Sequence, residues 1–228
     1  MIPRIIHQIW INPIDPSRRD GMPPSIIERS QKWRALHPDF QYRLWSLADA
    51  QQLSQLLRGP RGPRALGALR FPAARADVAR LMVMRAFGGF WIDLRLNPRR
   101  AFLEELRGFD LLLAEHFPQA DRPDPGGDLI NSFIGAAPHQ PFFGRVLDRV
   151  LSNIEQRESG SIFGFTGGLN LTRILKIMQT EPGSLGTYHV LGHQSTWGKL
   201  FGVGSGDYNA RLGHWRIREE TESPYIDG

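Results

Sequence analysis

The sequence contains no cysteine, and only three of its 28 lysine and arginine residues are lysine. Without cysteine there can be no disulfide framework and no thiolate metal site, so any metal ion would need oxygen or nitrogen ligands. A chain without disulfides suits a reducing compartment. We therefore expect a cytoplasmic protein.

Long apolar runs are also missing. No stretch approaches the roughly 20 apolar residues that a membrane-spanning helix needs. The first residues, MIPRIIHQIW, lack the apolar centre of a signal peptide. We therefore expect no membrane span, and peripheral contact with a membrane stays open.

The positive charge comes almost entirely from arginine, and the net charge is +5. Because a guanidinium can bind phosphate through two parallel hydrogen bonds, a nucleotide diphosphate, a lipid phosphate or an acidic polysaccharide would suit this chain. The arginines are scattered rather than collected on one predicted element. This distribution argues against a nucleic-acid-binding module, and we expect no nucleic-acid partner.

Length and composition predict one globular domain over residues 1–228, since 41% of the residues are hydrophobic and 22% are charged. Hydrophobic periodicity predicts strands over 4–11, 41–45, 90–94, 109–115 and 129–137. It predicts helices over 25–36, 46–57, 72–87, 141–154 and 169–178, with Ser46 and Asp49 at capping-box spacing. Residues 13–24, 59–67 and 117–128 are expected to be loops, and the chain beyond 192 a loop-rich cap. Alternating strands and helices predict an α/β fold with a mostly parallel sheet.

One segment concentrates polar residues in a useful arrangement. Asp77 and Arg80 lie on a predicted helix that ends at Gly88-Gly89, and an aromatic strand then leads to Asp93. In open α/β sheets, ligands bind just beyond the carboxyl ends of strands. Asp93 is therefore predicted to lie where a carboxylate can bind a ligand.

This helix, Gly-Gly turn and aromatic strand resemble the core of the glycosyltransferases with a DXD sugar-binding region. That superfamily includes bacterial capsular-type and yeast-type mannosyltransferase-like enzymes of family 32 and, more distantly, the clostridial glucosylating toxins. Three further segments resemble it: IPRIIHQIW at residues 2–10, NSFIGAAPHQPF from Asn131, and the turn Thr166-Gly167-Gly168. The resemblance spans residues 2 to about 175.

The resemblance implies a GT-A-like fold and a role in bacterial polysaccharide biosynthesis. The implied reaction moves a hexose from a nucleotide-sugar donor to a glycan, lipid-linked or protein acceptor, with retention of configuration. It also implies that Trp10 stacks on the nucleotide base as in the toxins. On that ground a UDP-hexose is favoured over GDP-mannose.

The resemblance assigns roles to the polar residues as well. Asp77 would contact ribose or sugar hydroxyls, Arg80 the sugar or the diphosphate, and Asp93 both ribose and sugar, with Asn131 beside them in the donor site. The alternatives are a surface salt bridge between Asp77 and Arg80, and a core position for Trp10. If the roles hold, alanine at Asp77 or Asp93 should weaken donor binding and leave the melting temperature nearly unchanged.

The C-terminal region offers two candidates for an element that closes over the donor. Ser195 and Trp197 resemble the Ser-x-Trp element of the toxins, in which the indole N–H would lie near the glycosidic oxygen. His214-Trp215 resembles the His-Trp element of shorter family members. We favour Ser195 and Trp197, with the other pair serving packing.

The sequence departs from the superfamily at one position. The second DXD aspartate is the usual direct ligand of Mn²⁺ or Mg²⁺, and here Arg95 takes its place, so Asp93 is the one candidate metal ligand left in the motif. A guanidinium cannot coordinate a cation, but it can donate two hydrogen bonds to phosphate.

Two hypotheses follow from this departure. Either Arg95, together with Arg80, supplies positive charge for a metal-independent transfer, or the chain is a catalytically silent relative that binds a nucleotide sugar or glycan without turnover. A hydrolase is disfavoured, because no pair of carboxylates stands out as a two-carboxylate site.

Overall fold

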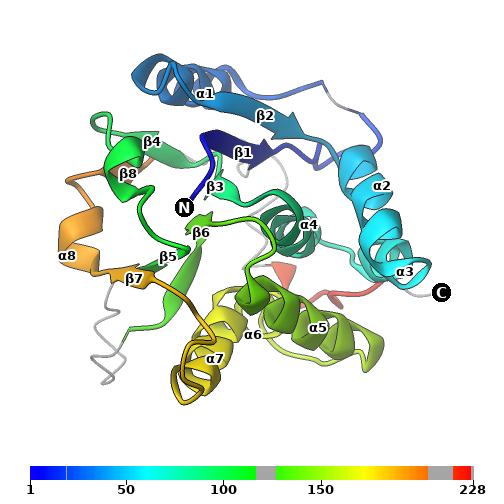
Figure 1. The fold of residues 1–228 in the computed structure, drawn as a ribbon. Helices are drawn as coiled ribbons and strands as arrows, with labels where there is room; N and C mark the ends of the chain where they lie inside the picture. The colour runs from blue at the N-terminus through cyan, green and yellow to red at the C-terminus, as the bar shows by residue number, and fades with distance from the viewer. Residues whose placement is uncertain (19, 117–126, 205–217, 227–228) are drawn as a thin grey trace.

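The computed structural model describes residues 1–18, 20–116, 127–204 and 218–226. Its centre is a six-stranded sheet with the strand order β2-β1-β3-β6-β5-β7 (Figure 1). The strands are β1 (Ile5–Ile9), β2 (Gln41–Trp45), β3 (Gly89–Ile92), β5 (Leu111–Glu115), β6 (Leu129–Ala136) and β7 (Tyr188–Leu191). β6 runs antiparallel to both of its neighbours, and the other pairings in this sheet are parallel. The predicted α/β fold with a mostly parallel sheet is confirmed.

Side chains alternate between the two faces of β3, as the pleat of a strand requires. Trp91 joins one buried cluster, whereas Phe90 and Ile92 join the other. The Trp91 side is covered by α4 (Pro72–Phe87), α5 (Pro141–Glu155) and α7 (Gly168–Gln179), which lie together on one side of the sheet in Figure 1. The opposite side is covered by α1 (Pro24–Leu36), the short helix η1 (Leu103–Leu106), and a small sheet of β4 (Leu96–Pro98) and β8 (Phe201–Val203). Both faces of β3 are therefore buried, and the strand is rigidly held.

The predicted helix boundaries hold where the local signal was strong. α2 (Leu47–Arg58) begins with the expected capping box: Asp49 N–H donates to Ser46 Oγ, and Ser46 N–H donates to Asp49 Oδ2. α1 differs slightly, because its N-cap is Pro23 rather than Ser25. Proline suits the first positions of a helix, where no N–H is needed.

The prediction of a loop over residues 59–67 is wrong. A helix, α3 (Arg61–Ala68), lies there and packs against α2. Pro63 falls in its first turn, where the missing N–H breaks no helical hydrogen bond. Gly62 allows close packing, since a Cβ at that position would lie 2.5 Å from the Ser54 carbonyl oxygen. Contact with α2 therefore outweighs the poor helix propensity of this segment.

The remaining elements lie in the second half of the chain. α6 (Ile162–Phe165) precedes the Thr166-Gly167-Gly168 turn, and α8 (His193–Thr196) and β8 lie in the region expected to be loop-rich. Residues 117–126 of the expected loop over 117–128 lie outside the described residues. Within the described ranges, no helix combines the length and apolar character needed to cross a bilayer.

Candidate functional site

Asp93 follows β3 directly, at the carboxyl end of that strand. Its backbone N–H donates to the carbonyl of Ser132 on β6 at 2.8 Å, which fixes the backbone. The indole Nε1 of Trp91 donates to Asp93 Oδ1 at 2.8 Å. The side chain keeps 34% of its surface exposed, so the carboxylate is both anchored and accessible.

Arg80 joins the two acidic residues of the motif. Its Nη1 donates to Asp77 Oδ1 at 2.6 Å and its Nη2 donates to Asp93 Oδ1 at 2.9 Å. The guanidinium carbon lies 5.2 Å from the centre of the Trp91 ring, and the side chain is only 4% exposed. The alternative of a surface salt bridge between Asp77 and Arg80 is wrong, because the pair is buried.

Asp77 lies at the buried end of the same network. Asn131 Nδ2 donates to Asp77 Oδ1 at 2.8 Å, and the hydroxyl of Thr166 donates to Asp77 Oδ2 at 2.9 Å. The network therefore connects α4, β6 and the turn before α7 at the end of the sheet where β3 finishes. Four residues that the resemblance selected, Asp77, Arg80, Asp93 and Asn131, lie within one hydrogen-bonded cluster.

Burial dominates the electrostatics of this cluster. It raises the pKa of Asp77, and the Arg80 charge and the Thr166 hydroxyl act in the opposite direction. Burial alone would lower the pKa of Arg80, but Asp93 and Asp77 outweigh it and raise that pKa. The guanidinium of Arg80 stays protonated in proteins, and it pairs with the carboxyl groups of both Asp77 and Asp93.

Arg95 lies on a turn that begins at Asp93. Leu96 N–H donates to the Asp93 carbonyl at 2.9 Å, so Arg95 takes the third position of a four-residue turn. Three successive carbonyls of this turn accept hydrogen bonds from outside it: Leu94 from Arg29 Nε at 3.1 Å, Arg95 from Gly204 N–H at 2.7 Å, and Leu96 from Trp33 Nε1 at 2.9 Å. The turn is therefore held rigidly from α1 and from the segment after β8.

The residues at this edge do not fit a DXD-type site for Mn²⁺ or Mg²⁺. Oδ1 of Asp93 already accepts two N–H groups. Arg95, at the position of the second aspartate, would repel a cation. In the part of the chain that the structure describes, no cluster of three or more His, Asp or Glu side chains could hold a metal ion.

Trp10 lies just beyond β1, whose neighbour in the sheet is β3. The residue is 5% exposed, and its Nε1 donates to the Asp20 carbonyl at 3.1 Å. Asn12 Nδ2 donates to the same carbonyl at 3.1 Å, so both side chains hold the loop that follows β1. Stacking of a nucleotide base on Trp10 stays a prediction.

Ser195 and Trp197 follow β7 and lie at the same end of the sheet as Asp93, beside the end of β5. Trp197 Nε1 donates to the Glu115 carbonyl at 3.3 Å, and its ring packs edge-on against Phe201. Ser195 is exposed, and its hydroxyl donates to the Gly192 carbonyl at 3.1 Å. β6 separates β5 from β3, the strand that leads to Asp93. His214 and Trp215, the other candidates for the closing element, lie outside the described residues.

Three residues of the site were not assigned a role from sequence. Thr166 binds Asp77, Trp91 binds Asp93, and Arg29 binds the turn that carries Arg95. The Thr166-Gly167-Gly168 turn was noticed, but nothing local indicates where its hydroxyl points. Arg29 is only 7% exposed. The sequence indicates this burial weakly, because Arg29 is a charged residue among the apolar positions of a predicted helix.

Comparison with curated proteins identifies relatives, although no protein-family model matches the chain. Inositol phosphoceramide mannosyltransferase 2 of Schizosaccharomyces pombe is 32% identical over 160 residues, which are 68% of this chain and 39% of that protein. Mannosyl phosphorylinositol ceramide synthase SUR1 of Saccharomyces cerevisiae is 28% identical over 179 residues, covering 77% of this chain and 42% of that protein. The chain thus spans about two fifths of the length of these fungal relatives. The expected bacterial origin and role in polysaccharide biosynthesis find no support among them.

Two solved structures share the fold. The PaToxG glycosyltransferase superposes with a TM-score of 0.60 at 19% identity, covering 80% of this chain and 71% of that one. The UDP-bound glycosyltransferase domain of the YGT toxin gives 0.55 at 9% identity, covering 89% and 83%. These matches confirm the predicted GT-A-like fold. The chain thus has the fold of these glycosyltransferases and is similar in sequence to fungal mannosyltransferases.

Proposed function

We propose that the chain transfers mannose from GDP-mannose to a hydroxyl group of a lipid-linked acceptor. The observation that carries this proposal is the buried Asp77–Arg80–Asp93 network at the end of β3, in a chain similar to mannosyltransferases. The sequence alone favoured a UDP-hexose through Trp10. Of the two donor types that the resemblance implies, only GDP-mannose carries the sugar named in the relatives, so the preference is reversed.

Asp93 is proposed to bind the donor directly. Its carboxylate is partly exposed, and its Oδ1 is oriented by Arg80 and Trp91. A carboxylate accepts hydrogen bonds from vicinal hydroxyls, such as those of ribose or mannose. Asn131, which is partly exposed, is proposed to contact the donor beside Asp93.

Asp77 and Arg80 are proposed to act mainly by holding Asp93 in place. The terminal nitrogens of Arg80 both bind carboxylates, and Arg80 is 3% exposed, so it offers little to a diphosphate. Asp77 is 7% exposed, and both of its oxygens accept hydrogen bonds. A network of this kind keeps the reactive carboxylate within the narrow range of geometry that catalysis needs.

Transfer is proposed to retain the anomeric configuration, as the resemblance implies. The bond from the sugar anomeric carbon to the diphosphate oxygen breaks, and the diphosphate keeps the electron pair. The acceptor oxygen attacks from the face that the diphosphate leaves, and its proton passes to the departing phosphate oxygen. Proton NMR of the first-formed product decides this point: an α-mannoside from the α-linked donor agrees with retention, and a β-mannoside contradicts it.

A catalytically silent relative is the second candidate, and Arg95 is the observation that favours it. If Arg95 leaves the site without a means of stabilising the leaving diphosphate, the chain would bind GDP-mannose and release it unchanged. Binding and turnover must therefore be measured separately.

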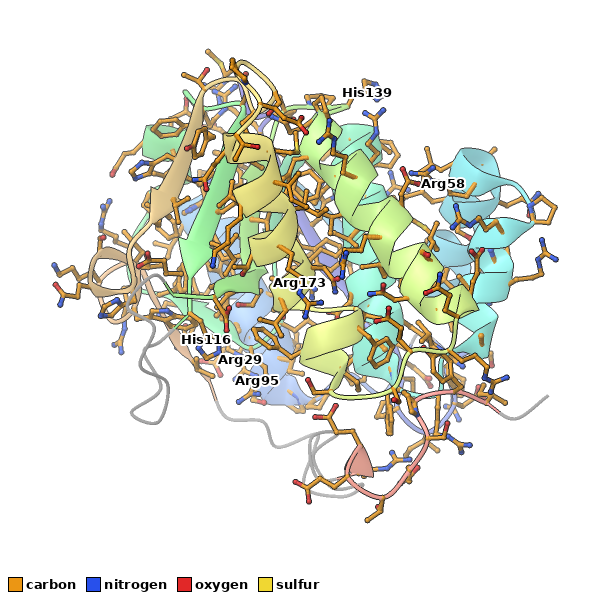
Figure 2. All side chains as sticks on the ribbon, turned by 90° about the horizontal axis from the view of Figure 1, so that it is seen from below. Arg29, Arg58, Arg95, His116, His139 and Arg173 are labelled. Atoms are coloured by element: carbon orange, nitrogen blue, oxygen red, sulfur yellow. The ribbon has the colours of Figure 1, made fainter. Side chains whose placement is uncertain are left out.

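The test begins with calorimetric titration of GDP-mannose and of UDP-hexoses. It continues with product detection by mass spectrometry, using an inositol-containing sphingolipid as acceptor. We expect GDP-mannose to bind most tightly and a mannosylated lipid to form, with both lost in Asp93→Asn. Arg58→Met serves as a control for the nonspecific effects of a substitution. Arg58 lies on α2, and Figure 2 shows it far from Arg95, which follows Asp93 by two residues. Binding without product supports the silent relative, and failure of every nucleotide sugar to bind rejects the proposed function.

A further inference from the structure

Glu115, at the end of β5, belongs to a second group of polar side chains that the proposed donor site does not use. Its carboxylate Oε2 accepts the backbone N–H of His193 at 3.2 Å, and the imidazole Nδ1 of His193 lies 3.9 Å from the same oxygen. The side chains of Glu115 and His193 are 31% and 33% exposed. Ser195, which is exposed, lies two residues further along α8. Glu115, His193 and Ser195 are named the β5–β7 cluster below.

The β5–β7 cluster has unused hydrogen-bonding capacity. Within the described part of the chain, Oε1 of Glu115 and the ring nitrogens of His193 have no hydrogen-bond partner. The Ser195 hydroxyl donates to the Gly192 carbonyl at 3.1 Å, so its oxygen can still accept a hydrogen bond. An imidazole can both donate and accept, and a carboxylate accepts at both oxygens. The cluster therefore offers a ligand two acceptor oxygens and one ring that can donate.

Gly192 leaves the space between two of these side chains open. A Cβ at this position would lie 3.6 Å from Glu115 Oε2 and 3.6 Å from Ser195 Oγ, which are ordinary van der Waals distances. Gly192 has φ −63° and ψ 149°, a backbone conformation that any residue can adopt. The backbone therefore does not require glycine here, and the absence of a side chain leaves room beside Glu115 and Ser195.

The β5–β7 cluster and Asp93 lie at the same end of the sheet. β3, β5 and β7 run in one direction, since β6 is antiparallel to both β3 and β5 and β7 is parallel to β5. Figure 2 shows His116, the residue after Glu115, at the end of the molecule where Arg95 lies. A substrate bound at Asp93 and a ligand of the cluster would therefore enter from the same side of the protein.

The distance between the two places is too large for the hydroxyls of one sugar ring. β6 lies between β3 and β5, so Asp93 and Glu115 are about 10 Å apart across the sheet. Asp93 binds Ser132 of β6, whereas Glu115 pairs with Leu129, which adds about 10 Å along the strand. Trp10, the predicted contact of the nucleotide base, follows β1 on the other side of β3. A donor that reaches from Trp10 to Asp93 therefore leaves the β5–β7 cluster to the second substrate.

The charge of the cluster indicates which part of that substrate suits it. The Glu115 carboxylate attracts the O–H groups of a polyol and repels a phosphate. Its exposed neighbours, an imidazole and a hydroxyl, also exchange hydrogen bonds with O–H groups. This combination favours a ring that carries several hydroxyl groups.

We propose that Glu115, His193 and Ser195 bind the polyhydroxyl ring of the acceptor, while Asp93 binds the donor. This inference rests on the proposed function, because it names the residues that hold the second substrate of the same transfer. It gives Ser195 a role toward the acceptor in place of the donor-closing role that the resemblance implies. Trp197 supports the cluster, because its Nε1 donates to the Glu115 carbonyl at 3.3 Å.

The experiment uses myo-inositol as the probe, added to protein already saturated with GDP, and measures its binding by saturation-transfer NMR. The variants are Glu115→Ala, Glu115→Gln, His193→Ala and Gly192→Ala. Gly108→Ala is the matched control for Gly192→Ala, since a Cβ at Gly108 would have no atom within 4 Å. For each variant, calorimetry measures the affinity for GDP-mannose and thermal unfolding measures the melting temperature. Turnover with the inositol-containing sphingolipid gives kcat and the KM for the acceptor.

We expect Glu115→Ala to weaken myo-inositol binding by about 10- to 100-fold, the usual loss for a hydrogen bond to a charged group. Glu115→Gln should retain part of the affinity, because its amide oxygen still accepts. Gly192→Ala should weaken binding by filling the open space, although it leaves the contact between Glu115 and His193 intact. Each of these variants should raise the KM for the lipid and keep the affinity for GDP-mannose, and Gly108→Ala should behave as wild-type protein.

Two results would overturn this inference and leave the proposed function standing. One is that Glu115→Ala and Gly192→Ala, both folded, bind myo-inositol and use the lipid as well as wild-type protein does. The other is that these variants lose as much affinity for GDP-mannose as for myo-inositol, which would assign the cluster to the donor.

Two further results separate the inference from the proposed function. If wild-type protein binds GDP-mannose but forms no product, myo-inositol binding decides: binding that Gly192→Ala weakens supports the inference, and no binding overturns it. If wild-type protein binds no nucleotide sugar, the proposed function and this inference are rejected together.

Discussion

The hydroxyl of Thr166 donates to Oδ2 of Asp77 at 2.9 Å, although 89 residues separate the two in the sequence. The turn that carries Thr166 is itself held by Asn153, whose Nδ2 donates to the Phe165 carbonyl at 2.9 Å. Since Arg80 bridges Asp77 and Asp93, this turn influences the carboxylate proposed to bind the donor. The orientation of the site thus depends on a residue outside the DXD segment.

Replacing Thr166 with valine should weaken donor binding without removing any proposed donor contact. The variant leaves one oxygen of a buried carboxylate without its donor, at a cost of about 1–3 kcal/mol in the free energy of unfolding. We expect a lower affinity for GDP-mannose in calorimetry, and Thr166→Ser should restore it. A valine variant that is less stable but binds the donor as tightly as wild-type protein would show that Thr166 has only a structural role.

Asp77 and Asp93 should respond differently to replacement, contrary to the expectation from sequence that neither affects the melting temperature. Asp77→Ala removes one partner of a buried guanidinium, and breaking a buried ion pair in this way costs about 3–5 kcal/mol. Asp93→Ala also removes a partner of Arg80 and of Trp91, but Asp93 is 34% exposed, so water can replace part of what is lost; this variant should lose less stability than Asp77→Ala and still abolish donor binding. Urea denaturation measures the first effect and calorimetry the second. Equal losses of stability in the two variants would contradict the assignment of Asp77 as the buried support.

Stability should fall as the pH is lowered from 7 to 5, because of His7. Its Nδ1 accepts from Trp45 Nε1 and its Nε2 donates to the Gly88 carbonyl, so the neutral ring satisfies both partners. Burial lowers the pKa of His7 from 6.5 to about 4, with the Arg43 charge acting in the same direction and the Gly88 hydrogen bond opposing it. Between these two pKa values the unfolded chain binds a proton that the folded chain does not. The stabilisation is therefore complete above pH 6.5 and is lost as the pH falls toward 4.

The expected slope for His7 is at most about 1.4 kcal/mol per pH unit. Urea denaturation at pH 7, 6 and 5 measures it, and His7→Phe should have a lower stability at pH 7 and a shallower dependence on pH. Burial also lowers the pKa of His37, so a smaller dependence of the same sign should persist in this variant. Wild-type stability that is constant between pH 7 and 5 would refute the prediction.

Gly88→Ala should destabilise the protein by about 2 kcal/mol or more. Gly88 has φ 61° and ψ −147°, a backbone conformation that is essentially restricted to glycine and that costs a residue with a Cβ about 1–3 kcal/mol. The new Cβ would also lie 2.5 Å from the Ala136 carbonyl oxygen. Gly108→Ala is the matched control, since a Cβ there would have no atom within 4 Å. Thermal unfolding compares the two, and equal melting temperatures would show that the backbone at Gly88 adjusts without strain.

Much of the fold was predictable because its signals are local. The Gly88-Gly89 pair marks the end of α4, and the aromatic residues after it predict a buried strand that leads to Asp93. The apolar stripe of α5 predicts which side chains are buried, and Ser46 with Asp49 predicts where α2 begins. Each of these features depends on residues within a few positions of one another, so hydrophobic periodicity and capping chemistry are enough to determine them.

Only the tertiary structure decided how the site is connected. The sequence places Asp77 and Arg80 on one helix, but their burial and the link to Asp93 depend on β3 and β6 packing beside α4. The contact of Thr166 with Asp77, and of Arg29 with the turn at Arg95, joins segments that no local pattern relates. α3 forms for the same reason, because Gly62 packs against α2. Periodicity indicates which face of an element is buried, whereas the partner that a polar side chain meets is determined by which elements the folded chain brings together.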